Sequence, residues 1–346
     1  MLEEIDPLVD PRWSKFLAAH PDASIFHTSG WLQALRRTYG HKPAALLATG
    51  RAGELAGALV FCRLQSRFRG RRLVSLPFSD HCSLIFSSHI QAAELLTSFQ
   101  QTATAERSKS TEIRPDSALP LDPHKWQPSR AFYLHRLDLR PGAAAVFEGF
   151  HKDCIRRRIR HAEREKVTVS EGKDSESVRQ FYALLIKTRR RHGVPPQPLA
   201  WFENLISCLG QSAIIHCARK DGQPIAAILT LLYGKTLYYK YGASDARFHD
   251  LGGMPYLFWH AIQKAISDGL EALDLGRSDC DNPGLIRFKE RLGAKRAALQ
   301  YWESLSEGSK RQSTGRPLVS LAHLACRHLP DRFLAGLGEL CYRHMD

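Results

Sequence analysis

The chain has 346 residues, enough for two domains that each bury a core, and its 49 Lys and Arg against 35 Asp and Glu give a formal net charge of +14 at pH 7. This charge favours an anionic partner, such as a phosphorylated metabolite, RNA or an acidic membrane surface, without choosing among them; no DNA partner is expected. No apolar run reaches the roughly 20 residues of a membrane-spanning helix, and the eight cysteines lack a C-x-x-C pair or a tight Cys/His cluster, which argues against a metal site and for reduced thiols.

The first half of the chain predicts a sheet with flanking helices. The acidic, proline-containing residues 1–13 lack the basic start and apolar core of a signal peptide, so we expect a cytoplasmic protein. Apolar spacing predicts helices over 30–39 and about 90–106. Strands are predicted at 44–49, 54–64, 71–78, 82–86, 111–114 and 131–139, with a turn at 51–53. Neighbours His81 and Cys82 on such a strand would point to opposite faces, which argues against a nucleophile pair.

The second half predicts a mixed sheet covered by helices, so the fold class is α/β with both antiparallel and parallel strands. Helices are predicted at about 143–166, 175–192, 198–209, 255–268 and 283–292. Strands are predicted at 167–170, 212–219, 224–233, 236–244, 272–276 and 298–304, and tight turns make three of them a meander. Pro141-Gly142 marks a boundary between domains at 1–140 and 141–306.

Residues 307–346 predict a linker and two amphipathic helices, at 318–329 and 331–345, separated by Pro330. Docking of these helices on the body of the protein is the simpler interpretation. Peripheral contact with a membrane surface is the alternative.

The junction between strand 272–276 and the helix that follows it carries two cations. Asn282 is a good N-cap, Pro283 suits the first helical position and Gly293 suits the stop. Leu285, Phe288 and Leu292 define the expected buried face, and Arg287 and Arg291 point outward. Lys289 falls on the flank of that face, which predicts a half-buried side chain.

Arg277 and Lys289 are the strongest candidates for chemistry. Arg277 follows the carboxyl end of a strand, where α/β sheets place ligands, and the next helix start favours an anion. The two cations would converge on a phosphate, a carboxylate or the oxyanion of acyl transfer. Two alternatives stay open: Lys289 covers apolar surface with its stem, or the charges are neutralised by Asp274, Asp279 or Asp281.

Further candidates lie on neighbouring elements, each with a structural alternative. Asp245, just after strand 236–244, would accept a proton or orient an amine, or cap a turn. Tyr239 and Tyr241 share one face of that strand, which lines a cleft or belongs to the core. Gln197 and Trp201 follow a Pro-Pro turn and would form a lip over an acceptor, or position the next helix.

The run 151–166 is strongly basic. Arg156, Arg160 and Arg164 recur at steps of four, opposite an apolar stripe at Phe150, Ile155, Ile159 and Ala162. Such a face is either solvated or binds phosphates of a nucleotide-linked precursor or of RNA.

The chain shares motifs with a known protein family. The motifs are six segments, the tripeptide GRS (276–278) and the spacing of Gly284, Phe288, Lys289 and Gly293. The chain resembles the Fem family of aminoacyl transferases and relatives with a GNAT-type acyltransferase fold. The segments are FHTSGWLQAL (26–35), SLPFSDHCSLIF (75–86), HKDCIRRRIRHAERE (151–165), TRRRHGVPPQP (188–198), YYKYGASDARFHDLGGMPYLFWHAI (238–262) and RHLPDRFLAGLGE (327–339). The last is similar to the tail of a subgroup associated with exopolysaccharide and cell-envelope loci.

The resemblance implies two tandem GNAT-like domains and transfer of an acyl or aminoacyl group to a primary amine. The donor would be acyl-coenzyme A or aminoacyl-tRNA as co-substrate, with no permanently bound cofactor, and the acceptor an anionic small molecule or a nucleotide- or lipid-linked precursor. It implies that Ser278, Asn282 and Phe288 join Arg277 at the acceptor, with Ser79 and Asp80 contributing from the first domain.

The coenzyme A loop of GNAT enzymes has a counterpart here in Arg247, Gly252 and Gly253, at a different spacing from the usual Arg/Gln-x-x-Gly-x-Gly/Ala. This departure argues against coenzyme A as donor, and a coenzyme A-dependent N-acetyltransferase acting on an amino sugar or small amine is kept as one alternative function. A non-catalytic protein that binds RNA or an acidic membrane surface is another.

Overall fold

The computed structural model describes residues 2–50, 55–66, 70–305 and 326–342. The predicted turn at 51–53, the linker that starts at 307 and most of the predicted helix 318–329 lie outside the described residues.

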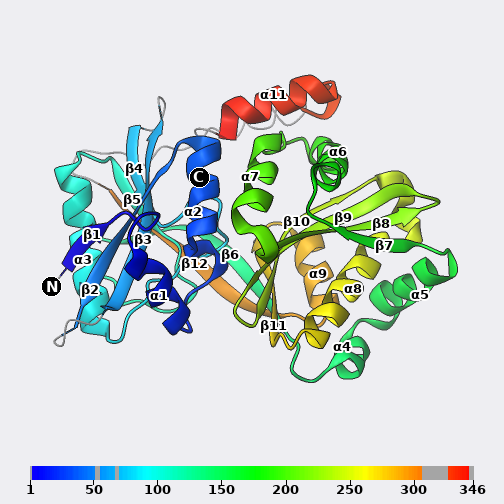
Figure 1. Cartoon of the computed structure of the whole chain (residues 1–346), viewed down its shortest axis with the longest axis horizontal. Coiled ribbons are helices and arrows are strands. Elements are labelled where there is room, and N and C mark those ends of the chain that lie inside the picture. Colours follow the sequence, from blue (N-terminus) through cyan, green and yellow to red (C-terminus); the bar gives the residue numbers. More distant parts are fainter. Residues whose placement is uncertain (1, 51–54, 67–69, 306–325, 343–346) are drawn as a thin grey trace. The chain divides into compact units, whose positions relative to one another are not determined.

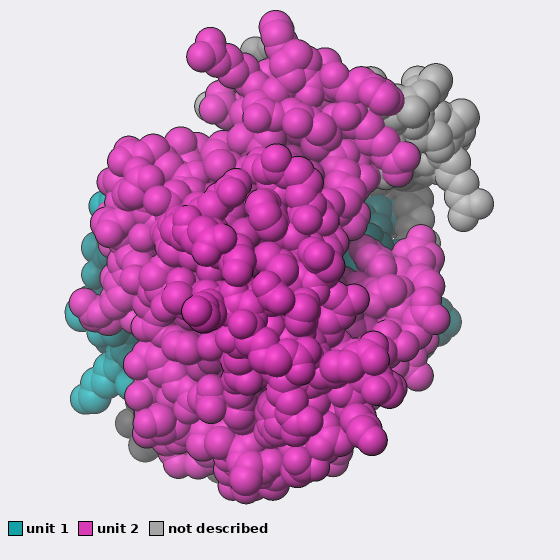
Figure 2. Space-filling view, turned by 90° about the vertical axis from the view of Figure 1, so that its right-hand side faces the viewer, with its two compact units in different colours: residues 1–132, 298–313, 340–346 teal, residues 133–297, 314–339 magenta. Residues whose placement is uncertain are grey.

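The chain divides into two compact units that are not simple halves. Unit 1 comprises residues 1–132, 298–313 and 340–346, and unit 2 comprises residues 133–297 and 314–339. The residues of unit 2 form one continuous magenta surface in Figure 2. The chain thus returns to unit 1 after unit 2, whereas the predicted domains follow one another along the sequence.

Unit 1 is built on a mixed sheet. Its strands lie in the order β1-β2-β3-β4-β5-β12, with β4 and β5 parallel. The strand bounds are β1 Leu2–Ile5, β2 Lys42–Thr49, β3 Leu55–Ser66, β4 Gly70–Val74, β5 Ser110–Ile113 and β12 Lys295–Leu305; the helices are α1 Pro11–Ala19, α2 Ser29–Tyr39 and α3 His89–Ala105. Buried Phe61 of β3 and Phe99 of α3 lie with ring centroids 5.0 Å apart, so α3 covers one face of this sheet.

Residues 82–86 do not form the predicted strand. They take part only in two isolated bridges, Ala58 with Ile85 and Cys82 with Arg114. β4 also ends earlier than predicted, because Leu76 and Phe78 adopt left-handed φ angles of 59° and 62° that interrupt an extended chain.

Unit 2 carries the meander and the parallel crossover that the sequence predicts. Its strands lie in the order β6-β11-β10-β9-β8-β7, antiparallel from β7 to β10, with β10 and β11 parallel. The strand bounds are β6 Gln127–Asp138 (which begins in unit 1), β7 Thr168–Gly172, β8 Ala213–Lys220, β9 Gln223–Tyr233, β10 Thr236–Ser244 and β11 Ala272–Asp279. Helices α6 Ser175–His192 and α7 Leu199–Leu209 cover one face of this sheet, and α8 Gly253–Ser267 and α9 Pro283–Arg291 cover the other (Figure 1).

The predicted helix over 143–166 is broken. It comprises α4 Ala143–Gly149, a π-helical turn η2 Lys152–Arg156 and α5 Arg157–Arg164. Phe150 is extended, and the His151 ring accepts hydrogen bonds from the main-chain N–H groups of Asp153 and Cys154, so His151 caps a new helix start. The predicted apolar stripe is confirmed, since its four residues are buried.

Helix α11, Asp331–Tyr342, packs against the loop before α7. Gly338 approaches the main chain of Pro196 so closely that a Cβ there would lie 2.0 Å from the carbonyl oxygen. Asp331 forms an ion pair with Arg190. Among the described residues, every helix is too short or too polar to cross a membrane.

Candidate active site at the carboxyl ends of β10 and β11

Parallel strands β10 and β11 part toward their carboxyl ends. They pair only at Thr236–Ala272, Leu237–Leu273 and Tyr238–Asp274, although β10 continues to Ser244 and β11 to Asp279. The paired register of the two strands ends at Tyr238 and Asp274. This opening lies at the edge of the sheet where α/β proteins bind ligands.

Lys289 is buried beneath the end of β11. Its side chain is 2 % exposed, and its Nζ donates to the carbonyl oxygens of Gly276 and Arg277, each at 2.9 Å. The predicted half-buried position is therefore wrong. Two charge-assisted hydrogen bonds hold the ammonium inside, which joins α9 to the last turn of β11.

The buried face of α9 differs from the prediction by one residue. Ile286 and Lys289 are buried, with Leu292 just beyond the helix, whereas Leu285 and Phe288 are half-buried. The inward turn of Lys289 toward Gly276 accounts for this rotation. Asn282 caps α9 as predicted, since its side chain accepts from the N–H of Leu285 at 3.1 Å.

The other residues predicted around Lys289 lie on β11 and α9. Arg277 is half-buried and belongs to β11, which extends past the predicted strand end at 276. Ser278 is 1 % exposed, and its hydroxyl has no hydrogen-bond partner among the described residues. Phe288 packs on Phe258 of α8, whose ring in turn lies 4.8 Å from that of Tyr239. Lys289 and Ser278 are therefore two buried polar groups of this junction.

Two residues of β6 that the sequence did not single out belong to the same neighbourhood. Arg136 donates to the buried carboxylate of Asp274 at 3.1 Å, and that carboxylate also accepts from the N–H of Gly276. His135 is fully buried, and neither ring nitrogen forms a hydrogen bond of acceptable geometry with a described residue. Burial, with the positive charge of Lys289, lowers the pKa of His135 to about 4. No spacing in the sequence links β6 to α9, so only the fold identifies these groups.

His135→Leu should make the protein less sensitive to acid. The native pKa of about 4 lies below the ordinary 6.5, so the unfolded chain binds an extra proton between these values and stability falls as the pH drops through that window. The full loss at pH 4 is roughly 2–4 kcal/mol. Leucine removes this loss, so urea unfolding of the variant at pH 7.5 and pH 4.5 should differ less than in the wild type. An equal pH dependence in both proteins would contradict a neutral buried His135.

Asp245 follows the end of β10, and its carboxylate pairs with two basic side chains. Its carboxylate accepts from Lys187 at 2.7 Å and from Arg247 at 2.7 Å, and it also accepts from the main-chain N–H of Arg247. These bonds, that of Arg247 above all, hold the pKa of the Asp245 carboxyl well below its usual range. Such a carboxylate is a weak base, and it caps the short helix η4 Ala246–Leu251.

The predicted shared face of Tyr239 and Tyr241 is wrong. A β-bulge between them shifts the register of β10 against β9, so the alternation of side chains skips one residue at Lys240. The Tyr239 ring packs on Phe258 of α8, whereas Tyr241 packs on Phe202 of α7, on the opposite face (Figure 1). Only Tyr239 is therefore on the same side of the sheet as α9.

The predicted lip over an acceptor does not form, because both of its residues are inside the protein. Trp201 is fully buried, and its indole N–H donates to the Tyr241 hydroxyl at 2.8 Å. Gln197 is 6 % exposed and accepts from Arg189 at 3.2 Å. Their contacts position α7, which is the alternative role that the sequence also allowed for Gln197 and Trp201.

The loop between β10 and α8 is held by contacts with other residues of unit 2. Gly252 has a φ of +74°, and a Cβ there would lie 2.4 Å from the Arg158 carbonyl oxygen, so its glycine serves close packing on α5. Gly253 packs against Ile225. The Arg158 guanidinium donates to the carbonyls of His249 and Asp250, and Arg247 is held by Asp245. Internal contacts thus account for Arg247, Gly252 and Gly253.

In the basic run 151–166, the first of the three predicted arginines is paired with an acidic side chain and the other two are exposed. Arg156 donates to Glu148 of α4 at 2.5 Å and is only half-buried, whereas Arg160 and Arg164 are exposed. The two outer arginines are therefore on the solvated face that the sequence predicts.

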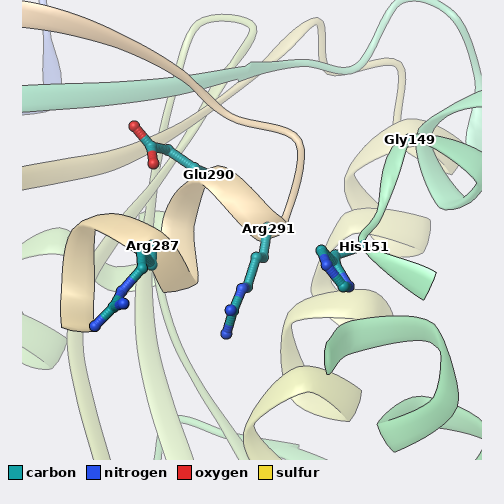
Figure 3. A pocket seen from close by; sticks show the side chains of 5 residues that line it. All are labelled: Gly149, His151, Arg287, Glu290 and Arg291. Atoms are coloured by element: carbon teal, nitrogen blue, oxygen red, sulfur yellow. The ribbon is translucent and has the colours of Figure 1, made fainter. Parts of the chain in front are cut away.

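An open pocket of about 340 Å³ lies on the outer side of α9. It is lined by Gly149, His151, Arg287, Glu290 and Arg291. Figure 3 shows the Arg287 and Arg291 side chains extending from one side of α9 and Glu290 from another. Both arginines point outward as predicted, and the resulting basic pocket suits an anion.

Ser79 and Asp80 belong to unit 1, where a buried cation holds their loop. Arg114, which is fully buried, pairs with Glu112 and donates to the carbonyls of Leu76 and Ser79. The Tyr301 hydroxyl donates to the Asp80 carbonyl at 2.6 Å. The main chain of this loop is thus fixed by hydrogen bonds within unit 1.

Cys82 is not an activated nucleophile. It is 1 % exposed, and burial raises the pKa of its thiol. His81, its neighbour, faces the Asp116 carboxylate at 3.6 Å. The conclusion against a nucleophile pair therefore stands on burial and not on the predicted strand, which does not form here.

Comparison with known proteins gives a family model and several similar structures. The model for the acetyltransferase (GNAT) domain matches residues 150–290. Over 140 residues the chain is 23% identical to the UDP-N-acetylmuramoylpentapeptide-lysine N(6)-alanyltransferase of Weissella viridescens, which covers 38% of this chain and 40% of that protein. The chain thus spans about two fifths of the length of that curated relative.

Two solved structures extend the similarity over most of the chain. FemX matches with a TM-score of 0.71 at 15% identity, covering 93% of this chain and 100% of that one. The C-terminal domain of a protein assigned as lysylphosphatidylglycerol synthetase, from Agrobacterium fabrum, matches with a TM-score of 0.52 at 15% identity, covering 84% and 89%. These findings confirm the predicted tandem GNAT-like fold, similar to that of FemX, and the domain match agrees with the expected acyltransferase class.

Proposed function

We propose that this protein is a cytoplasmic aminoacyl transferase that acts on a primary amine of an anionic cell-envelope precursor. The observation that carries the proposal is the buried Lys289 ammonium at the carboxyl end of β11, beside the opening between β10 and β11. The FemX-like fold and the alanyltransferase similarity support an aminoacyl donor and a peptidoglycan or lipid precursor over an exopolysaccharide one.

The reaction would be attack of the neutral acceptor amine on the ester carbonyl of the donor. A C–N bond forms, the ester C–O bond breaks, and the amine proton passes to the leaving alkoxide. Negative charge develops on the carbonyl oxygen, and Lys289 with Arg277 would stabilise it, as preorganised donors do in other acyl transfers. Lys289 would contribute in two ways: its positive charge would stabilise the oxyanion, and its hydrogen bonds to Gly276 and Arg277 would hold the end of β11 in position. Asp245 would orient a cationic group rather than take a proton, because its pKa is low.

Aminoacyl-tRNA is the proposed donor. Gly252 packs on Arg158, and Arg247 pairs with Asp245, so the residues expected to cradle a pyrophosphate are occupied by contacts within the protein. The basic pocket on α9 and the exposed arginines of α5 would contact phosphates of a polyanion. Peripheral membrane contact through the C-terminal helices remains part of the proposal for a lipid-linked acceptor.

The donor can be identified by thermal unfolding of the intact protein with acetyl-coenzyme A, longer acyl-coenzyme A, charged tRNA and nucleotide-linked sugars. A ligand that binds only the native state raises the midpoint. We expect a shift with charged tRNA and with a nucleotide-linked precursor. A shift with coenzyme A derivatives alone would replace the proposal with an N-acetyltransferase, the activity that the domain model names.

Reversing the charge of the pocket should weaken tRNA binding selectively. In Arg287→Glu/Arg291→Glu both cations that line the pocket are replaced, and each lost phosphate contact lowers the slope of log K against log salt by about one. We expect binding at least tenfold weaker in filter-binding titrations. Arg37→Glu/Arg179→Glu reverses two exposed arginines outside the pocket, so it is the control matched in charge and should bind like the wild type. Equal losses in both proteins would mean that the effect is net charge and not this pocket.

The non-catalytic alternative would be favoured if RNA raises the thermal unfolding midpoint but no labelled aminoacyl group is transferred to an amine under the same conditions. Transfer activity is therefore measured on the same samples, with radiolabelled aminoacyl-tRNA and a precursor that carries a free amine.

A further inference from the structure

Two histidines and a glutamate from three elements converge on the outer edge of the unit 2 sheet. Glu171 lies on β7, His216 on β8 and His260 on α8, and one donor atom of each lies within 4.8 Å of the others. Glu171 and His216 are directly opposite each other in the antiparallel register of β7 and β8, and α8 packs on β8. The three side chains are thus held by secondary structure and not by a loop.

The hydrogen bonds of His216 fix which of its nitrogens faces the cluster. Its Nε2 lies 3.0 Å from the Thr230 hydroxyl, whose oxygen is 3.5 Å from the Ile214 carbonyl. Because the hydroxyl proton goes to that carbonyl, the Thr230 oxygen accepts from Nε2–H. Nδ1 of His216 is then the nitrogen with a lone pair. A hydrogen bond to the far nitrogen is the usual way in which proteins orient a metal-binding histidine.

Glu171 and, by this tautomer, His216 direct electron pairs into the cluster, and one ring nitrogen of His260 faces the same carboxylate. His216 Nδ1 lies 3.3 Å from a Glu171 oxygen, and His260 Nδ1 lies 4.0 Å from the same oxygen. Neither nitrogen has a hydrogen-bond partner of good geometry among the described residues, and His216 is 2 % exposed. The buried lone pair of His216 repels the carboxylate that it faces unless a proton or a metal cation lies between them.

The spacing matches that of a bound transition metal. Zinc binds histidine nitrogen and carboxylate oxygen at about 2.0–2.2 Å, which in a tetrahedral site separates neighbouring ligand atoms by about 3.4 Å. The His216 to Glu171 distance of 3.3 Å already fits, and His260 needs only a small side-chain movement. Glu171 and His260 are partly exposed, so an ion and a water ligand can enter.

We propose that Glu171, His216 and His260 bind one divalent transition-metal ion of the zinc class, with water as the fourth ligand. Carboxylate and imidazole are ligands that suit zinc, and two histidines with one glutamate is a known ligand set for it. Strands β9 and β10 separate β8 from β11, so the site is distinct from the candidate active site. Its effect would be to fasten the edge strand β7 to α8. The sequence argued against a metal because these ligands lie far apart along the chain.

The test is metal binding by the full chain, stripped with a chelator and then titrated with Zn²⁺ in a calorimeter. We expect one saturable site per chain and a raised unfolding midpoint, since the ion binds only the native state. His260→Ala and Glu171→Gln, both at partly exposed positions that should not disturb folding, should weaken this binding at least tenfold. His124→Ala, an exposed histidine outside the cluster, is the control and should bind like the wild type.

Cobalt distinguishes this site from the cysteines. Co²⁺ in place of Zn²⁺ should give the visible spectrum of nitrogen and oxygen ligands, without the near-ultraviolet band of a sulfur ligand. A sulfur band, or Zn²⁺ binding that His260→Ala and Glu171→Gln leave unchanged, would overturn the proposal, as would the absence of saturable binding.

Discussion

Lys289→Met is expected to lower turnover by two to three orders of magnitude in a protein that still folds. Methionine keeps the length and apolar stem of lysine but removes the ammonium, and loss of a donor that stabilises a developing oxyanion typically costs a factor of about 10²–10³. The change also leaves the Gly276 and Arg277 carbonyls without this donor, which costs about 1–3 kcal/mol each. Turnover is measured with the donor identified by thermal unfolding, at a temperature well below the variant's own midpoint.

Lys264→Met is the matched control for this experiment. Lys264 lies on α8 and forms an exposed pair with Asp268, so its loss should leave turnover and midpoint close to those of the wild type. Unaltered turnover in folded Lys289→Met would limit Lys289 to a structural role, as the anchor of the β11 end.

Arg114→Met should destabilise unit 1 by about 3–5 kcal/mol, the range measured when one partner of a buried ion pair is removed. Arg114 has no exposed surface, pairs with Glu112 at 2.8 Å and donates to the Leu76 and Ser79 carbonyls. Its removal leaves the mostly buried Glu112 carboxylate with the half-exposed Arg130 at 3.1 Å in place of its buried partner, and it frees the loop that carries Ser79 and Asp80. The measurement is the urea midpoint of the first unfolding transition.

Arg71→Met serves as the comparison, since Arg71 lies on the neighbouring strand β4 and is exposed. We expect its midpoint to change little. If Arg114→Met unfolds at the same urea concentration as Arg71→Met, the buried network contributes nothing net to stability.

Periodic patterns predicted the architecture well. The meander β8-β9-β10, the parallel return to β11 and the cap of α9 at Asn282 all follow from alternation, turn residues and capping chemistry. These are local signals, and the fold obeys them. The buried apolar stripe at Phe150, Ile155, Ile159 and Ala162 is of the same kind.

Irregularities that depend on distant contacts could not be predicted. The bulge at Lys240 moves Tyr241 to the opposite face from Tyr239, and no residue at that position marks it. Lys289 turns inward because carbonyls of another element accept its protons. His135 enters the site from β6, more than a hundred residues before Lys289. Each of these three features depends on which strands become neighbours in the fold. The spacing of side chains along the sequence does not carry that information.

The return of the chain to unit 1 also sets an order of events during synthesis. β5 ends at Ile113, and its antiparallel partner on β12 begins at Trp302, roughly 190 residues later. At a translation rate of about 5–20 residues per second, that partner arrives about 10–40 s after β5 leaves the ribosome. For that interval β5 has an open hydrogen-bonding edge, the kind of surface to which other chains add. The amino-terminal unit is therefore completed last, and a fragment that ends near residue 140 would keep its open edge permanently.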